Sequence, residues 1–343
     1  MAEHTSQVRQ TLWRLIEVDA VTARGTQDSR VRGSAMPGKE GGVAIRVQGL
    51  RKRYGDVEAV RGIDLTVRKG EIFAFLGPNG AGKTTTVETL EGYRRRDAGE
   101  VEVLGADPVR PPTGWRARIG VVLQESEPEA ELTVKECVSF YAGYYPRPRP
   151  VVETLEMVGL ADRQGVRCGR LSGGQRRRLD VALALIGDPE LVFLDEPTTG
   201  FDPAARQSAW QLIAGLRDLG KTIFLTTHYM EEAEHLADRI AVIAAGRIVT
   251  EGTASTLGGR DAEASTVSFT LPAGVSATDL PPVVAAALVS GPGEKLEAQV
   301  ASPLPLLGVL AAWAKARNID LPDLQVSRPT LEDVYLQLTR ESR

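Results

Sequence analysis

The segment most informative about chemistry is a glycine-rich loop that ends in lysine and threonine. Residues 77–84 read Gly-Pro-Asn-Gly-Ala-Gly-Lys-Thr and fit the pattern G-x-x-x-x-G-K-T, between an apolar run and a helical pattern. The glycines let successive backbone N–H groups turn toward a phosphate, and the helix N-terminus adds partial positive charge. We therefore expect Lys83 to bridge the β- and γ-phosphates of ATP and the Thr84 hydroxyl to ligate Mg²⁺. A glycine-rich turn with a chance lysine is the alternative.

A second segment places two carboxylates at the end of an apolar strand. Residues 191–196 read Leu-Val-Phe-Leu-Asp-Glu. Asp195 suits the Mg²⁺ shell, directly or through water, as in other phosphate-loop enzymes. Glu196 is placed to reach an attacking water as general base. The alternative is an acidic pair that merely solvates the rim of the sheet, and the phosphate loop in the same chain argues against it.

Two further apolar runs are followed by polar residues that become candidate site residues only because the phosphate loop and the acidic pair are in the same chain. His228 follows residues 222–227, and Gln124 follows residues 119–123. Ligands of α/β sheets gather at the carboxyl ends of the strands. We therefore expect His228 to contact the γ-phosphate or the attacking water, and the Gln124 amide to contact Mg²⁺ or water. By itself, a histidine after a strand is usually structural.

Other aromatic, imidazole and basic residues have less specific interpretations. Tyr54 could stack on adenine or be a surface aromatic. His235 follows three glutamates in a polar helical pattern and is interpreted as a solvated surface residue. The basic runs 94–96 and 176–178 are interpreted as a solvated helix end and a polar helix face rather than nucleic-acid patches.

The composition bounds the class of protein. The chain has 343 residues, 42% of them apolar and 25% charged, which is ordinary for a globular protein. Its net charge of −4 argues against bulk attraction to nucleic acid. Cys137 and Cys168 are too few and too scattered for a disulfide framework or a zinc site, so we expect reduced thiols in a cytosolic protein. We expect neither a secretion signal nor a membrane span, so a partner must hold the protein at any membrane where it works.

These reactive residues require a sheet to position them. Around residues 45–67, apolar and polar residues alternate as in half-exposed antiparallel strands, whereas 71–76 is a continuous apolar run typical of a strand covered on both faces. Further apolar runs alternate with helical patterns, which predicts an α/β core. Val134, Cys137, Val138 and Tyr141 fall on one face of a helix, and a second helix is expected over about 151–159. The helical subdomain should span about 125–170.

The two ends of the chain differ from the centre. Residues 1–42 should form a flexible extension, with a short amphipathic helix over 8–18 and disorder after it. Residues 43–255 should form the catalytic domain. After a Gly/Ser/Thr-rich linker, residues 262–343 should form a small α+β domain with a strand near Phe269, a helix over 303–317 and a closing helix near Tyr335.

From Ile45 to Gly252 these residues resemble the nucleotide-binding subunits of ATP-binding cassette transporters. The segment 171–175, Leu-Ser-Gly-Gly-Gln, in register with the other elements carries the resemblance. It implies a phosphate-loop NTPase fold with a mixed-sheet core, an antiparallel β subdomain and an α-helical subdomain. The residues that match the family's ATP and Mg²⁺ site are Tyr54, Gly77, Pro78, Asn79, Gly80, Ala81, Gly82, Lys83, Thr84, Thr85, Gln124, Ser172, Gly173, Gly174, Gln175, Asp195, Glu196, Asp202 and His228.

The resemblance also implies partners. Two copies should form a head-to-tail dimer in which Ser172 and the glycine amides of one copy contact the γ-phosphate held by the other. Gln124 should transmit closure to a separately encoded membrane permease subunit, and Asp202 should couple the two sites. The protein should lie on the cytoplasmic face of the cell membrane, with no nucleic acid bound.

Within that family, the chain is similar to the drug- and antibiotic-resistance exporters of the daunorubicin type. Segments 199–203, 227–234 and 329–339 carry this likeness. It implies ATP hydrolysis that powers export of a drug-like, antibiotic or lipophilic compound. The alternatives are an importer ATPase subunit and a non-transport relative acting on nucleic acid or ribosomes. The N-terminal extension departs from the family pattern.

Overall fold

The computed structural model describes residues 42–122, 128–257, 265–272, 274–289, 295–321 and 323–327, together with Glu332 and Tyr335. The chain divides into two compact units between Ala254 and Ser255. The predictions for the N-terminal extension, Gln124 and most of the closing helix concern residues outside these ranges. In the described ranges, no helix is both long and apolar enough to cross a bilayer.

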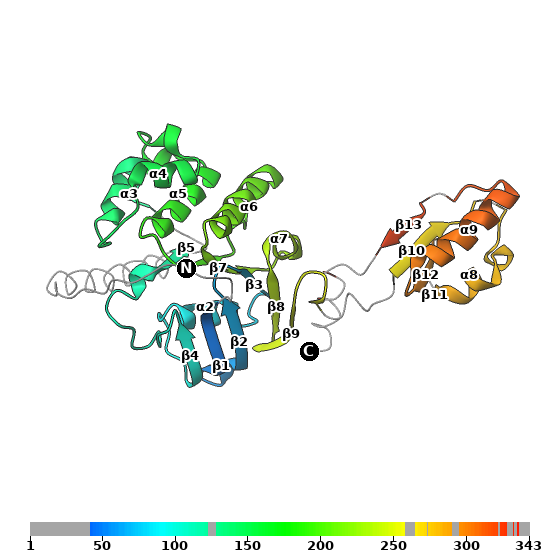
Figure 1. Ribbon diagram of the computed structural model, residues 1–343, viewed down its shortest axis with the longest axis horizontal. Helices are drawn as coiled ribbons and strands as arrows, with labels where there is room; N and C mark the ends of the chain where they lie inside the picture. Colours follow the sequence, from blue (N-terminus) through cyan, green and yellow to red (C-terminus); the bar gives the residue numbers. More distant parts are fainter. Residues whose placement is uncertain are drawn as a thin grey trace. The chain divides into compact units, whose positions relative to one another are not determined.

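A six-stranded sheet forms the centre of the first unit (Figure 1). Its order is β5-β6-β7-β3-β8-β9, parallel throughout except for β9, which is antiparallel to β8. Every residue of β3 is buried, as the continuous apolar run predicted. The strands are β3 (Ile72–Leu76), β5 (Ile119–Val122), β6 (Leu191–Asp195), β7 (Thr222–Thr227), β8 (Arg239–Ala244) and β9 (Arg247–Gly252).

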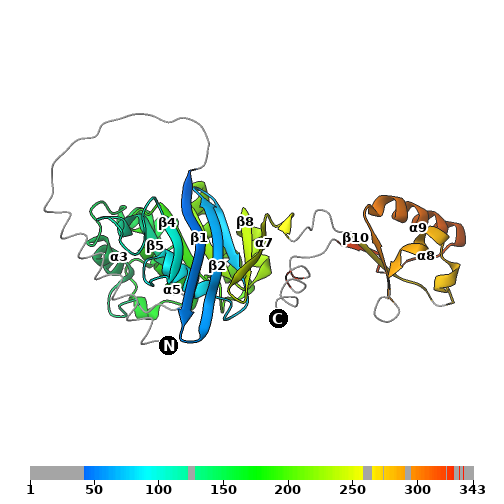
Figure 2. The same ribbon diagram turned by 90° about the horizontal axis from the view of Figure 1, so that it is seen from below.

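A three-stranded antiparallel sheet packs against the central sheet, with strand order β2-β1-β4 (Figure 2). The strands are β1 (Val43–Tyr54), β2 (Val57–Arg68) and β4 (Ala98–Val103). The predicted alternation is confirmed: Val47 pairs with Leu65 and with Val101, and all three side chains are buried. They share one core with Phe75 of β3 and Leu90 of helix α2 (Lys83–Leu90), so this core fixes where the phosphate loop starts.

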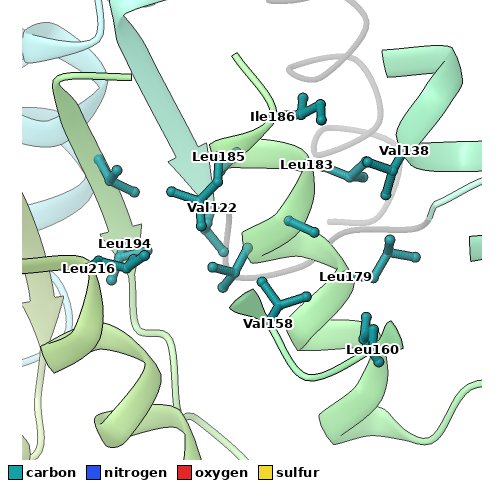
Figure 3. Packing of buried hydrophobic residues seen from close by; sticks show 14 of the residues in the cluster. Val122, Val138, Val158, Leu160, Leu179, Leu183, Leu185, Ile186, Leu194 and Leu216 are labelled. Atoms are coloured by element: carbon teal, nitrogen blue, oxygen red, sulfur yellow. The ribbon is translucent and has the colours of Figure 1, made fainter. Parts of the chain in front are cut away.

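Three helices form the insert between β5 and β6. They are α3 (Val134–Ala142), α4 (Val151–Met157) and α5 (Gly173–Leu185), and the predicted apolar face of α3 is buried. In Figure 3, Leu183 of α5 lies toward Val138 of α3, and Leu185 lies toward Val122 of β5. The α5 helix therefore packs on both the insert and the sheet. Helices α6 (Pro203–Asp218) and α7 (Met230–Leu236) flank β7.

The second unit has its own sheet and core. Its strand order is β11-β12-β10-β13, all antiparallel. The predicted strand near Phe269 and the predicted helix over 303–317 are both present, and Phe269 and Leu310 are fully buried. The elements are β10 (Ser265–Thr270), α8 (Pro282–Ala287), β11 (Leu288–Val289), β12 (Lys295–Val300), α9 (Pro303–Arg317) and β13 (Gln325–Ser327).

The expectation that both cysteines are reduced is confirmed, but their separation in the sequence is not kept in the fold. Although Cys137 and Cys168 are 31 positions apart in sequence, both thiols are buried and free in the helical insert. They are also close enough to influence each other's pKa. The insert brings them together because the segment before α3 pairs with the segment before α5, through the bridge Thr133–Arg167. Burial raises the pKa of both thiols, which keeps them protonated.

Candidate active site

A pocket of about 360 Å³ lies over the predicted phosphate loop. The loop needs glycine at two positions for different reasons. A Cβ on Gly77 would come within 2.5 Å of the Ile243 carbonyl oxygen, and Gly82 has φ 107°, which favours glycine. The pocket is lined by Ala59, Pro78, Asn79, Gly80, Gly82, Lys83, Thr84, Thr85 and Glu196. Most of the predicted loop residues, and the predicted base, therefore face one space.

Lys83 is the cation of this pocket. Its side chain is 6% exposed, and Nζ donates hydrogen bonds to the carbonyl oxygens of Gly77 at 2.7 Å and Pro78 at 3.3 Å. Nζ also lies 3.6 Å from Oε1 of Glu196. Burial lowers the pKa of Lys83, while Glu196 and Asp195 act in the opposite direction. The ammonium thus lines the pocket over the phosphate loop, close to two carboxylates.

Glu196 is held in a strained backbone conformation at the end of β6. Its φ is 45°, in the left-handed region. Its N–H donates to the carbonyl and hydroxyl oxygens of Thr226, both at 3.1 Å. These bonds aim a carboxylate that is 11% exposed into the pocket, where Oε2 accepts from the Thr199 hydroxyl at 3.3 Å. Strain of this kind clusters at functional sites, which fits a catalytic position.

His228 lies beside that carboxylate. Its Nδ1 is 3.2 Å from Oε1 of Glu196 and is buried, yet it makes no hydrogen bond within the described part of the chain. The centre of its ring lies 4.1 Å from that of Tyr229, and the two rings are tilted by 38°. The structure therefore brings together three residues predicted from separate segments, namely Lys83, Glu196 and His228.

Asp195 precedes Glu196 and, like it, is partly buried. Its carboxylate accepts a hydrogen bond from the Thr226 hydroxyl. Burial raises the pKa of Asp195 most strongly, and the charge of Glu196 acts in the same direction. Glu91, at the end of α2, was not predicted, and burial holds its pKa well above the ordinary value of 4.5, with Asp195 and Glu88 acting in the same direction. The pocket therefore adjoins an excess of desolvated carboxylates.

The predicted signature loop lines a different cavity. Ser172 caps α5 through a capping box, in which its Oγ accepts from the Gln175 N–H at 3.3 Å and its N–H donates to the Gln175 side chain at 3.1 Å. Ser172, Gly174 and Gln175 line a second cavity of about 360 Å³ that shares no lining residue with the phosphate pocket. Among the described residues of one chain, the two predicted halves of the ATP site therefore line separate cavities.

Arg177 connects the signature helix to the catalytic strand. Its Nη2 donates to the Asp195 carbonyl oxygen at 3.0 Å, and its Nε donates to the Pro197 carbonyl oxygen at 3.1 Å. The sequence interpretation of 176–178 as a polar helix face therefore misses Arg177. Three consecutive arginines give no sequence signal that distinguishes Arg177, which is half-buried, from the exposed Arg176.

Two predicted site residues have other contacts. Tyr54 is 39% exposed at the end of β1, and its ring is contacted by the cations of Arg94 at 5.1 Å and Lys52 at 5.6 Å. It is not among the described residues that line the phosphate pocket. Asp202 caps α6, and its carboxylate accepts from the Ala205 N–H at 2.8 Å. Their roles toward adenine and across a dimer remain predictions.

The polar helix containing His235 also differs from its interpretation. His235 is exposed but stacks on Trp210 at 4.7 Å, so it packs on a neighbour as well as facing solvent. Glu232 is fully buried, unlike the exposed Glu231 and Glu234. Sequence alone could not separate these glutamates, because α7 has only seven residues and its buried face depends on α6.

Comparison with known proteins gives matches over both units. Residues 60–199 match the family model for ABC transporters, and residues 265–330 match the C-terminal domain model of ABC transporter domain-containing proteins. The chain is 41% identical to the daunorubicin resistance ATP-binding protein DrrA3 of Streptomyces coeruleorubidus, over 88% of this chain and 97% of that protein. It is 39% identical to Nod factor export ATP-binding protein I of Ralstonia nicotianae, over 87% and 95%.

Solved structures match the first unit. One is cbiO1 of Clostridium perfringens, part of an ABC transporter complex, with 27% identity, a TM-score of 0.56 and coverage of 62% of this chain and 88% of that one. Another is a dimeric ATP-binding cassette with ADP and phosphate bound, with 25% identity, a TM-score of 0.55 and coverage of 61% and 98%. The predicted fold class is confirmed.

Proposed function

This chain belongs to the family of ABC transporter ATP-binding proteins, and from that premise we propose that it hydrolyses ATP to power export of a drug-like, antibiotic or lipophilic compound. The observation that carries the proposal is similarity over nearly the whole length of a daunorubicin resistance protein, with the C-terminal unit included. Relatives named for Nod factor export support the same direction of transport. An importer subunit and a non-transport ATPase have no comparable support.

In the proposed reaction, Glu196 is the general base. Its carboxylate takes a proton from water as the water oxygen bonds to the γ-phosphorus, and the bond from that phosphorus to the bridging oxygen breaks to release ADP. Lys83 binds the β- and γ-phosphates, and His228 orients the water or a γ-oxygen. The 3.2 Å and 3.6 Å separations of Glu196 from His228 and Lys83 support this division of roles.

Mg²⁺ fits the donors beside this pocket. In the described ranges, no three His, Cys, Asp or Glu side chains gather as a metal cage. Mg²⁺ rarely uses such a cage, because it keeps waters and substrate phosphates and takes one or two protein oxygens. We assign those oxygens to the Thr84 hydroxyl and the Asp195 carboxylate, whose desolvated charge favours a nearby cation. The ion would neutralise charge on the phosphates. Gln124 is proposed as a further contact.

A second copy of the chain is the proposed partner at the site. Ser172 and the amides of Gly173 and Gly174 would contact the γ-phosphate held by the other copy, with Gln175 near it. Two observations support this pairing: the signature and the phosphate loop line separate cavities, and a relative of known structure is a dimer with ADP and phosphate bound. Asp202 would couple the two sites.

The second proposed partner is a separately encoded membrane permease, which would hold the dimer at the cytoplasmic face of the cell membrane. The test is transport into inside-out vesicles that contain this chain and the membrane protein encoded beside its gene. We expect MgATP to drive uptake of fluorescent daunorubicin, and a matched Lys83→Met chain to give none. ATP hydrolysis without uptake of any of several anthracyclines and lipophilic probes, together with co-purification with ribosomes or DNA, would overturn the export proposal.

A further inference from the structure

Glu232 is a buried carboxylate to which the reaction above assigns no role. It lies on α7 with an exposed fraction of 0%, and its burial raises the pKa of the carboxyl group. Burying such a group is costly unless hydrogen bonds compensate. The same helix carries Glu231, which is exposed and whose nearest described cation is Arg206 at 3.8 Å. Particular contacts must therefore compensate the cost of burying the Glu232 carboxylate.

One oxygen of Glu232 joins α7 to two other segments. Oε1 accepts hydrogen bonds from the Thr198 hydroxyl at 2.8 Å and from Nε1 of Trp210 at 3.2 Å. Thr198 is fully buried and stands two residues after Glu196. Trp210 belongs to α6, which begins just after that loop. The carboxylate therefore anchors the loop that carries the proposed general base.

The same residue is tied to the loop that carries His228. That loop connects β7 to α7, and α7 begins two residues after His228. The Thr227 hydroxyl accepts from the Tyr229 N–H at 2.9 Å, and it also lies near enough to Glu232 to lower the pKa of that carboxyl. Since seven residues are too few for a helix stable by itself, these contacts add to the packing of the buried Ala233 and Leu236 in holding α7 in place.

We propose that Glu232 is a positioning residue that holds the Glu196 loop and the His228 loop at a fixed separation. The strands β6 and β7 are neighbours in the sheet, but both catalytic side chains lie beyond the last ladder pair, Asp195–Thr226. Beyond that pair, the Thr198–Glu232 hydrogen bond is a side-chain link between the two loops, bridging 34 positions of sequence. This inference rests on the roles proposed for Glu196 and His228.

The experiment compares variants of the full chain by steady-state ATP hydrolysis and by binding of a non-hydrolysable ATP analogue. Glu232→Ala removes the acceptor, Glu232→Gln keeps an acceptor oxygen at the same place, and Glu231→Gln is the matched control on the same helix. Because small displacements of catalytic groups cost up to about 10²-fold, we expect Glu232→Ala to lower kcat by about that factor. KM and analogue binding should stay within about threefold, since the phosphate loop is untouched.

The kcat values of the remaining variants should follow how much of the Thr198–Glu232 hydrogen bond each variant keeps. We expect Glu232→Gln to retain more activity than Glu232→Ala, and Glu231→Gln to match the parent. Thr198→Val removes the other partner of the hydrogen bond and should reproduce part of the kcat loss. If Glu232→Ala does not fold, Thr198→Val and Glu232→Gln carry the test.

A double-variant cycle separates positioning from general support of the fold. If Glu232 acts through His228 and Glu196, its kcat effect should shrink clearly in a His228→Ala background, because coupled residues are non-additive. Equal losses in both backgrounds, or parallel losses of kcat and analogue binding, would overturn the proposal. A severe defect in Glu196→Gln with none in Glu232→Ala would refute only this inference, whereas normal hydrolysis by Glu196→Gln would refute the function on which it rests.

Discussion

Oε1 of Glu196 lies 3.2 Å from Nδ1 of His228, and the same oxygen lies 3.6 Å from Nζ of Lys83. One carboxylate oxygen thus faces an imidazole from the loop after β7 and an ammonium from α2. Three separate segments of sequence converge on that oxygen. Changes to any of the three should therefore alter the other two, which guides the predictions below.

Replacing the proposed base should separate binding from turnover. Glu196→Gln keeps the shape of the side chain but removes its charge and its capacity to take a proton. We expect kcat to fall by about 10²–10⁴-fold, while binding of a fluorescent ATP analogue persists and an ATP-bound dimer accumulates. Rapid-quench hydrolysis and sedimentation in MgATP measure both results. The assignment of Glu196 is wrong if this variant turns over like the parent.

Because the carboxyl group of Glu91 is buried, replacing it with glutamine should stabilise the protein, and more so at higher pH. Its pKa is held well above 4.5, chiefly by burial. At pH values between the ordinary pKa of the unfolded chain and the raised pKa of the folded state, the folded protein binds more protons than the unfolded chain. Glu91 therefore destabilises the fold increasingly as pH rises. Glu91→Gln removes this ionisation. We expect its Tm to exceed that of the parent by more at about pH 8 than at about pH 5, as measured by calorimetry.

An equal Tm difference for Glu91→Gln at the two pH values would contradict the raised pKa. Glu88→Gln is the comparison variant. It removes a charge that helps to raise the pKa of Glu91, but it also breaks the ion pair with Arg94 at 2.5 Å, so we expect a smaller gain in Tm at the higher pH than for Glu91→Gln.

Removing the Arg177 guanidinium should weaken the contact between signature helix and strand. Arg177→Met leaves the carbonyl oxygens of Asp195 and Pro197 without their donor. An unpaired buried polar group costs about 1–3 kcal/mol. We expect a lower Tm and a lower kcat, whereas the exposed neighbour changed as Arg176→Met should stay within about 0.5 kcal/mol of the parent. Thermal unfolding and hydrolysis rates that do not distinguish the two variants would exclude this role.

The first unit should fold without the second. Each unit has its own core, and the second centres on Phe269 and Leu310. We expect residues 1–254 to unfold cooperatively with a Tm close to that of the same unit in the full chain, and to bind the ATP analogue. Loss of ATP-dependent dimerisation in this fragment would assign the second unit to the dimer contact, and retained dimerisation would favour a regulatory role.

The elements that could be predicted are those whose signal is local. The continuous apolar run of β3 and the spacing of the glycine-rich loop before Lys83 depend on neighbours in sequence. Glu91, Arg177 and Glu232 could not be found this way, because each is a charged residue, in a helix or directly after one, whose burial depends on elements far along the chain. Hydrophobic periodicity assigns charged residues to solvent, and it is wrong where a hydrogen bond compensates burial.

The separation of the signature loop and the phosphate loop into two cavities of one chain has a kinetic consequence. If each copy completes the ATP site of the other, the rate of ATP hydrolysis per chain rises with the concentration of the protein and falls on dilution. A cell could then keep the ATPase inactive by keeping the concentration of the chain low. A membrane partner that binds two copies would raise their local concentration, and would therefore activate hydrolysis as well as carry the transported compound.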